Sequence, residues 1–146
     1  MRRPVGDVML QDWQHVHNVV IPTHVLTLDD VRERALHYHL EVAYAGSTAD
    51  SDLVGCSTVR PPTDDDEAVA TVIARVLPAY RGRGYGEELY VRGLDLAWEL
   101  GARTVETVVL ASNTDGLRFA QKHGFGEVER YLLPDETIPW VTLRLG

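Results

Sequence analysis

The middle of this 146-residue chain joins a strand to a helix through a turn rich in glycine, residues 82–86. Before the turn, residues 68–77 are rich in β-branched side chains and are followed by a proline, which predicts a strand. After it, apolar residues recur at helical spacing from Gly86, and Gly101 stands where a left-handed helix cap belongs, so a helix of about sixteen residues is expected. Such a turn aims backbone N–H groups and the positive end of a helix dipole at one point, where a phosphate can bind.

Hydrophobic spacing and turn residues predict the other elements. Thr27 and Asp30 match a capping box, in which each side chain accepts a hydrogen bond from the backbone of the other. The expected helices are Trp13–Val20, 28–38 and 112–124, the last begun by Ser112 and Asp115, and the expected strands are 40–45, 53–60, 104–110, 126–132 and 138–145. Helices alternate with strands only in the second half, which predicts an α/β fold of the α+β type: a single mixed, mostly antiparallel sheet flanked by helices. We expect residues 1–146 to form a single domain.

Two assignments to a face follow from the same patterns. Alternation places Val54, Cys56 and Thr58 on one face of their strand. Helical spacing places Trp98 on the apolar stripe of the helix that follows the glycine turn. Cys56 is expected to be a small buried apolar residue rather than a catalytic nucleophile. For Trp140 two roles stay open, a core residue or an aromatic wall of a small-molecule site.

Composition narrows the classes of function. A net charge of −8 would repel a phosphate backbone, so no nucleic-acid partner is expected. No apolar run approaches the ~20 residues that span a bilayer, so no membrane partner is expected either. The single cysteine, Cys56, is typical of a cytoplasmic protein. The pairs His15-x-His17 and His37-x-His39 lack a third ligand, and side chains at i and i+2 of a helix point apart, so no metal site is expected.

Two well-known phosphate-binding loops do not fit the glycine turn. A Walker loop needs Lys followed by Ser or Thr after its last glycine, whereas Gly86 is followed by Glu87-Glu88. A dinucleotide fingerprint needs an acidic residue at the end of the next strand, but that strand ends in Leu110. Neither a nucleoside triphosphate nor a dinucleotide is therefore the expected ligand.

The turn resembles the Arg-x-x-Gly-x-Gly loop of the GNAT N-acetyltransferases, with Arg81, Gly84 and Gly86 at its three positions. Downstream, Asn113 and the Gly124-Phe125 pair resemble a second segment of that family, and the resemblance covers roughly residues 40–145. It implies a GNAT-like acyl-CoA N-acyltransferase fold with acetyl-CoA as cosubstrate. The residues that it implies as cofactor-binding are Val76, Leu77, Arg81, Gly82, Arg83, Gly84, Tyr85, Gly86 and Asn113.

The implied function is transfer of an acetyl group from acetyl-CoA to a primary amine of a small molecule, by direct attack of the amine on the thioester. Many members of the family carry a glutamate and a tyrosine where this chain has Ala70 and Ala120, so the catalytic residues stay unassigned. The side chains that could substitute are Glu67 and Glu106 as bases through water, and Ser112 and Tyr131 on the leaving thiolate.

Those absences leave an alternative open, a non-catalytic acyl-CoA-binding or regulatory GNAT-like module. Only Pro4–Leu10 is left for the first strand that the family implies. That strand could be short, absent or supplied by another chain, which makes a homodimer one of the expected partners.

Overall fold

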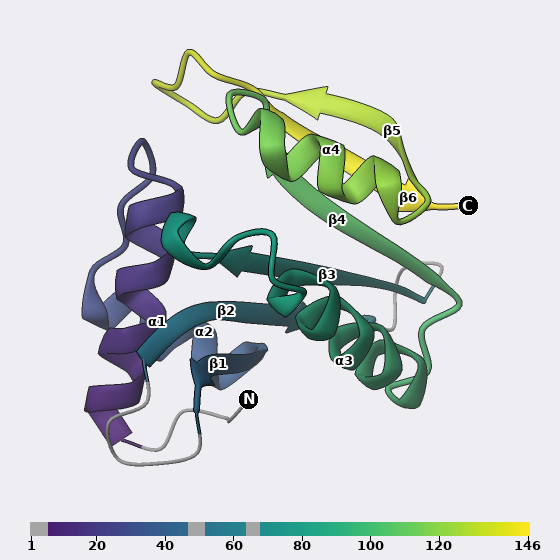
Figure 1. Cartoon of the computed structure of the whole chain (residues 1–146). Helices are drawn as coiled ribbons and strands as arrows, with labels where there is room; N and C mark the ends of the chain where they lie inside the picture. The colour runs from purple at the N-terminus through teal and green to yellow at the C-terminus, as the bar shows by residue number, and fades with distance from the viewer. Residues whose placement is uncertain (1–5, 47–51, 64–67) are drawn as a thin grey trace.

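The computed structural model describes residues 6–46, 52–63 and 68–146. Within these residues the chain forms six strands, four α-helices and one short 3-10 helix (Figure 1). Their bounds are α1 (Gly6–Val20), α2 (Leu28–His37), β1 (His39–Ala45), β2 (Asp52–Arg60), β3 (Val69–Val76), η1 (Pro78–Tyr80), α3 (Tyr85–Glu99), β4 (Thr104–Leu110), α4 (Thr114–Lys122), β5 (Phe125–Tyr131) and β6 (Trp140–Leu145).

The strands form one mixed sheet in the order β1-β2-β3-β4-β6-β5. Every neighbouring pair is antiparallel except β3 and β4, which are parallel. Helices α1 and α2 cover one face, where Trp13 packs with Cys56 of β2. Helix α3 covers the other face, where a Cβ on Gly93 would come 2.5 Å from the Val72 side chain of β3. The predicted fold class, a mostly antiparallel mixed sheet flanked by helices, is confirmed.

The parallel pair β3 and β4 opens toward the carboxyl ends of its strands. The two strands pair only at their beginnings, from Val69 opposite Thr104 to Thr71 opposite Glu106. Beyond this point β4 continues beside β6, while β3 continues beside β2. Figure 1 shows the two strands diverging from their common end. The fold therefore leaves a gap in the middle of its sheet, and backbone groups that a ladder would use are left for other partners.

Helix α2 begins at its predicted residue, Leu28, whereas α1 begins at Gly6, before its predicted start at Trp13. The Thr27 hydroxyl accepts a hydrogen bond from the Asp30 N–H at 3.1 Å, and the Asp30 carboxylate accepts one from the Thr27 N–H at 2.9 Å, so the predicted capping box is confirmed. Only the segment Pro4–Leu10 was left for the first strand that the resemblance implies, and that strand could be short, absent or supplied by another chain. Residues 6–10 instead form the beginning of α1, and residues 1–5 lie outside the described part of the chain.

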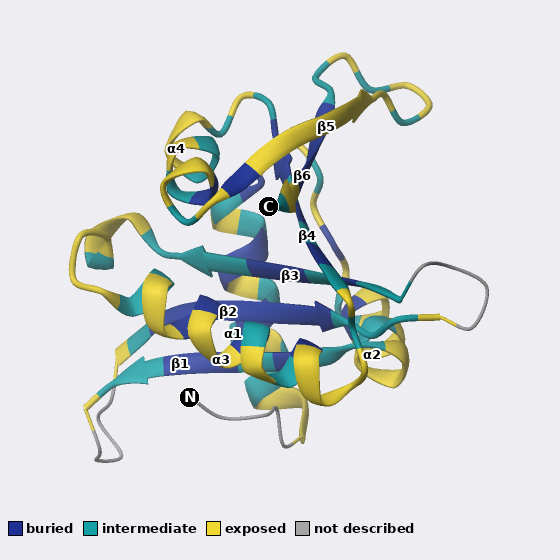
Figure 2. Ribbon diagram, turned by 90° about the vertical axis from the view of Figure 1, so that its right-hand side faces the viewer, coloured by how far each residue is buried: buried dark blue, intermediate teal, exposed yellow. Residues whose placement is uncertain are grey.

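Both predictions about faces are wrong in part. Strand β2 has a bulge against β1 at Val54, so the side chain of Val54 joins the cluster around Leu89 of α3 while Cys56 joins the cluster on the α1 side. The strand is central and buried along most of its length, as Figure 2 shows. Trp98 is 45% exposed, because it lies in the last turn of α3, outside the buried stripe that ends at Ala97.

The described residues offer neither a membrane-spanning helix nor a cluster of metal ligands. None of the helices among them is long and apolar enough to span a membrane. No three His, Cys, Asp or Glu side chains gather there in an arrangement that could hold a metal ion.

Candidate active site

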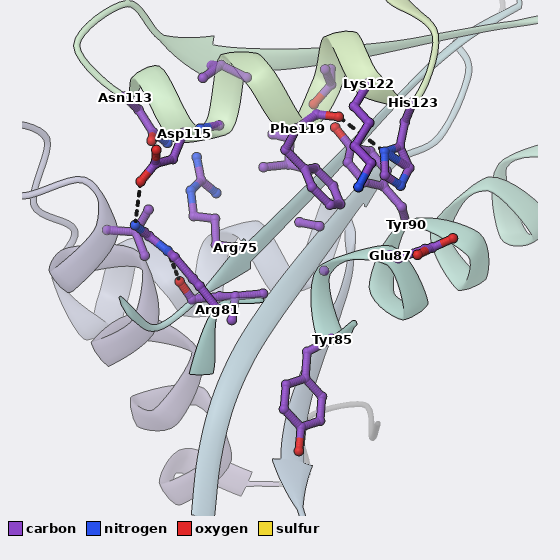
Figure 3. Close-up of a pocket in the computed structure, with 18 of the residues that line it drawn as sticks. Arg75, Arg81, Tyr85, Glu87, Tyr90, Asn113, Asp115, Phe119, Lys122 and His123 are labelled. Atoms are coloured by element: carbon purple, nitrogen blue, oxygen red, sulfur yellow. Dashed lines mark hydrogen bonds and ion pairs between the residues drawn. The ribbon is translucent and has the colours of Figure 1, made fainter. Parts of the chain in front are cut away.

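The gap between β3 and β4 opens into a cleft with a volume of about 440 Å³ (Figure 3). Its walls are the carboxyl-terminal halves of the two strands, the glycine turn, the first turns of α3, and α4. At one end it reaches Val20 and Ile21, where α1 stops. Most of the residues that sequence predicts for the cofactor line this cleft: Val76, Arg81, Gly82, Gly84, Tyr85, Gly86 and Asn113.

Leu77 and Arg83 are the two predicted cofactor residues that do not line it. The Leu77 N–H donates to the Val54 carbonyl at 2.8 Å, and the Leu77 carbonyl accepts from the Tyr80 N–H at 2.9 Å, so both backbone groups are already used. The exposed guanidinium of Arg83 lies over the Tyr80 ring, 5.6 Å from its centroid. The structure thus places one of these residues in the fold's own hydrogen bonding and the other on the surface.

The N–H groups of Gly82 and Gly84, two residues that line the cleft, donate no loop or cap hydrogen bond to the backbone of the described residues. Gly82 and Gly84 have positive φ values of 77° and 88°, a backbone conformation that glycine adopts without steric cost, and no atom lies near their missing side chains. Gly84 is the N-cap of α3 and supplies no side-chain acceptor to the first N–H groups of that helix. Unsatisfied N–H groups and the helix dipole favour an anion at this point.

Gly86 has a different role, since it lets α3 and α4 approach each other. A Cβ on Gly86 would come 3.2 Å from the ring of Phe119 and 3.6 Å from the Val76 side chain. Phe119 in turn stacks on Tyr90 of α3, with ring centroids 5.0 Å apart. A larger residue at this position would push α4 away and widen the cleft.

Charged side chains of opposite sign line the cleft, among them the positive Arg81 and the negative Glu87 and Asp115. Arg81 donates to the Val76 carbonyl at 3.2 Å and pairs with Asp115 of α4 at 3.4 Å, so it bridges the turn and α4 across the cleft (Figure 3). Glu87, in the first turn of α3, also lines the cleft. The anion site therefore depends more on its backbone amides than on an excess of positive side chains.

Helix α4 begins one residue later than the sequence pattern predicts. Asn113, rather than Ser112, is its N-cap, and the Asn113 side-chain oxygen accepts a hydrogen bond from the Gly116 N–H at 3.1 Å. Gly116 packs tightly here, since a Cβ would come 2.6 Å from the Asn113 amide nitrogen. With its oxygen used by the cap, the Asn113 side chain offers the cleft its NH₂ group, a donor.

Substitutions at Asn113 separate the cap from the donor. We expect Asn113→Ala to lower the free energy of unfolding by about 1 kcal/mol, and Asn113→Ser to preserve it, because serine caps a helix equally well. Both variants lose the NH₂ donor, so CoA affinity should fall by a similar factor, roughly three- to tenfold, in each. Chemical denaturation and calorimetric titration with CoA measure the two effects. Full CoA affinity in Asn113→Ser would mean that Asn113 acts only as a cap.

The structure gives the proposed proton carriers no clear place at the cleft. Ala70 and Ala120 are fully buried in the core. The Glu106 carboxylate pairs with Arg144 at 2.7 Å and does not line the cleft. Glu67 lies outside the described residues. Glu106 is poorly suited to the role because its carboxylate is engaged by Arg144 and lies outside the cleft lining.

Four other residues from the sequence also lie away from the cleft lining: Ser112, Tyr131, Cys56 and Trp140. Trp140 is 6% exposed and packs with Ile21, while its indole N–H donates to Glu136 at 3.1 Å. Cys56 is buried in the core, and burial raises the pKa of its thiol to about 12. A thiol in this state is no nucleophile at neutral pH, which agrees with the structural role expected for it.

Among the cleft residues that sequence reasoning missed are Arg75 and His123. Arg75 lies on β3 and is partly buried, and burial lowers the pKa of its guanidinium to about 10. His123 caps α4, and its ring stacks on Phe119 at 4.3 Å between centroids. The signal for Arg75 was present in the sequence, as a single charged residue in the otherwise apolar run from Val72 to Leu77.

A model of the acetyltransferase (GNAT) family matches residues 8–125, which is most of the chain. The chain belongs to the GNAT family. The matched residues run from the first turn of α1 to the first residue of β5, and they include the glycine turn and Asn113. A search of curated protein sequences finds no match.

Solved structures share the fold over nearly the whole chain. NAA60 of Arabidopsis thaliana, solved with acetyl-CoA, aligns with a TM-score of 0.77 and 17% identity over 97% of this chain and 95% of its own. A ribosomal-protein-alanine N-acetyltransferase of Brucella melitensis aligns at 0.72 and 16%, over 97% and 96%. An N-acetyltransferase of Staphylococcus aureus Mu50 aligns at 0.72 and 18%, over 99% and 96%. At these low identities the similarity shows that the chain shares the fold. The substrates that those proteins act on are not thereby shown for this chain.

Proposed function

We propose that this GNAT-family chain transfers an acetyl group from acetyl-CoA to a primary amine of a small molecule. The observation that carries the proposal is the cleft itself, which opens between two parallel strands and has a turn of exposed amides at its rim. A pyrophosphate needs such a cluster of donors, and an extended pantetheine arm needs a slot with free backbone groups. Family membership supports acetyl-CoA as the cosubstrate, and solved GNAT relatives contain it.

The residues around the cleft fit CoA. The amides of residues 82–86 would hold the pyrophosphate, and the Asn113 amide group would donate to the pantetheine. Arg81 would contribute charge, although its present partners are Asp115 and the Val76 carbonyl. The bound thioester supplies an activated acetyl group, so that the chain has only to bind, orient and manage protons.

Attack by the amine requires that its nitrogen be uncharged, because a protonated amine has no free electron pair. The positions where many GNAT members carry a base and an acid are Ala70 and Ala120, and both are buried in the core. The cleft would therefore act by holding a neutral amine against the thioester, while backbone N–H groups at the end of β3 polarise the carbonyl. The leaving thiolate would take its proton from water or from the ammonium that forms.

The position of the cleft favours a small acceptor. The cleft extends from the glycine turn to Val20 and Ile21 at the end of α1, and a small acceptor would bind in this recess of the surface. The rival hypothesis is a module that binds acyl-CoA without turnover. The two alanines at the usual acid and base positions favour that rival.

One experiment distinguishes the two functions. The full chain is titrated with acetyl-CoA by calorimetry, and then release of free CoA is followed with a panel of amines that includes amino acids, polyamines and short peptides. We expect saturable CoA binding and amine-dependent release of CoA with at least one small amine. Binding without turnover on any amine would support the non-catalytic module, and turnover on peptides alone would overturn the small-molecule acceptor.

A further inference from the structure

We propose that the acceptor carries an anionic group, a carboxylate or phosphonate, next to its amine, and that Arg75 binds this group. The inference rests on the proposed function and goes beyond it by naming the chemistry of the acceptor. Three observations support it. Arg75 projects from one particular side of the sheet, it lines the cleft, and no carboxylate of the described residues pairs with it.

Arg75 projects from the face of β3 that α3 does not cover. Alternate residues of a strand point to opposite faces. The side chains of Val72 and Val76 contact α3, at Gly93 and Gly86 respectively. Val72 and Val76 are an even number of residues apart and share a face, whereas Arg75 is an odd number of residues from each. Its side chain therefore points to the opposite face. The glycine turn and the amino end of α3 therefore lie on the opposite side of β3 from the Arg75 side chain.

The cross-strand neighbours of Arg75 confirm this direction. Arg75 pairs with Cys56 of β2, and Cys56 packs against Trp13 of α1. Burial, and next the charge of Arg75, lower the pKa of His17 on α1 to about 3. Figure 3 shows the guanidinium extending into the cleft. The cleft thus has a cation on the α1 side, where the proposed function places the acceptor.

Arg75 has no counter-ion in the part of the chain that the structure describes. Within residues 6–46, 52–63 and 68–146 its guanidinium makes no hydrogen bond and no ion pair. Five other arginines of the described residues, all of them exposed, do pair with a carboxylate: Arg32, Arg81, Arg92, Arg130 and Arg144. A partly buried charge without a partner is costly, and in a chain with 22 acidic residues a partner would be easy to supply. An anionic ligand would satisfy it.

Two further arginines strengthen the field around Arg75. Arg34 of α2 and Arg60 of β2 are also partly buried, neither forms an ion pair within the described residues, and both lower the pKa of Arg75. The Nε atom of Arg60 is buried without a hydrogen-bond partner. Its guanidinium lies over the Tyr38 ring at 5.3 Å. Three partly buried arginines therefore interact electrostatically with one another in a chain whose net charge is −8.

An arginine fork binds carboxylate and phosphonate groups in a bidentate manner, which fixes orientation as well as supplying affinity. An acceptor held in this way would have its amine at a set distance from the guanidinium, and so at a set position against the thioester. Amino acids and their phosphonate analogues have this arrangement, whereas simple alkylamines and polyamines lack it.

The test uses acceptors that differ only in the anionic group: leucine with isoamylamine, phenylalanine with phenethylamine, and lysine with cadaverine. The phosphonate analogue of leucine distinguishes the two anions. Values of kcat/KM are measured for the wild-type chain, for Arg75→Met, which keeps the length without the charge, and for Arg75→Lys, which keeps the charge without the fork. Arg103→Met, at an exposed position away from the cleft, is the matched control.

We expect wild-type kcat/KM to be at least ~30-fold higher for the anionic member of a pair, and Arg75→Met to remove this preference mainly through KM. Arg75→Lys should restore part of it, and Arg103→Met should leave it unchanged. The dissociation constant of CoA, measured by calorimetry, should stay within about twofold in every variant. Equal losses on both members of a pair, or no wild-type preference, would overturn the inference, and a large loss of CoA affinity would make Arg75 a cofactor contact.

The proposed function can fail separately. If CoA binds but no amine is acetylated, the same pairs are tested for binding to the CoA-loaded chain by saturation-transfer NMR. Selective binding of the anionic members, lost in Arg75→Met, would support the anion site without catalysis. Absence of binding by every member would overturn the site as well.

Discussion

Replacing Gly84 with aspartate is expected to weaken CoA binding by roughly 30- to 100-fold, which corresponds to about 2 to 2.7 kcal/mol. Gly84 is the N-cap of α3 and has a φ of +88°, with open space around it. The introduced carboxylate would stand beside the N–H groups that we assign to the pyrophosphate. It would repel the phosphates and compete for the same donors. Calorimetric titration with CoA measures the change.

Two controls separate charge from backbone strain. Gly84→Ala brings the cost of a side chain at positive φ without the charge, about 1–2 kcal/mol of stability. Gly101→Asp brings both, but at the other end of α3, where φ is +94° and the surroundings are equally open. We expect Gly101→Asp to change CoA affinity by less than about twofold. The loss of CoA affinity in Gly84→Ala should lie between the losses in Gly101→Asp and Gly84→Asp. A folded Gly84→Asp chain with wild-type affinity would remove the turn from the cofactor site.

Features that depend on neighbouring residues in the chain could be predicted from sequence. The capping box of Thr27 and Asp30 needs only its two residues and a helix, and β4 has the predicted bounds because its β-branched run is sharply delimited. The glycine turn was recognisable because positive φ and open amides are encoded by glycine itself. These local signals, taken in order along the chain, were enough to predict the fold class.

Features that depend on tertiary contacts could not be predicted in the same way. The bulge at Val54 reverses the face of one residue because of how β1 pairs with β2, and nothing in the alternation reveals it. The predicted N-cap of α4 was Ser112, and the observed one is Asn113. Both residue types cap helices well, so only the geometry of the turn decides between them. Arg75 was visible as a charge within an apolar strand, but that no carboxylate of the described residues pairs with it could be known only from their positions in the fold.

The second large effect concerns protons. For an acceptor amine with a pKa of ~10.4, we expect kcat/KM to rise about tenfold per pH unit from roughly pH 6 to pH 9. The rise follows from the fraction of amine that is already neutral, which grows tenfold per unit below its pKa. It is expected because Ala70 and Ala120 cannot carry a proton and Glu106 is paired with Arg144. Initial rates at saturating acetyl-CoA, measured across that pH range, give the profile.

A base within the protein would change the shape of that profile. If Glu67, Glu106 or the cleft histidine His123 took the proton, the rate would level off above the pKa of that group, and replacing it with Gln or Asn would lower kcat by ~10²-fold or more while CoA affinity stayed the same. We expect Glu67→Gln, Glu106→Gln and His123→Asn to keep the unbroken rise. A plateau lost in one of them would identify the base. A plateau that survives all three would show that another group deprotonates the amine, and the account of the cleft as a site that only binds and orients would be wrong.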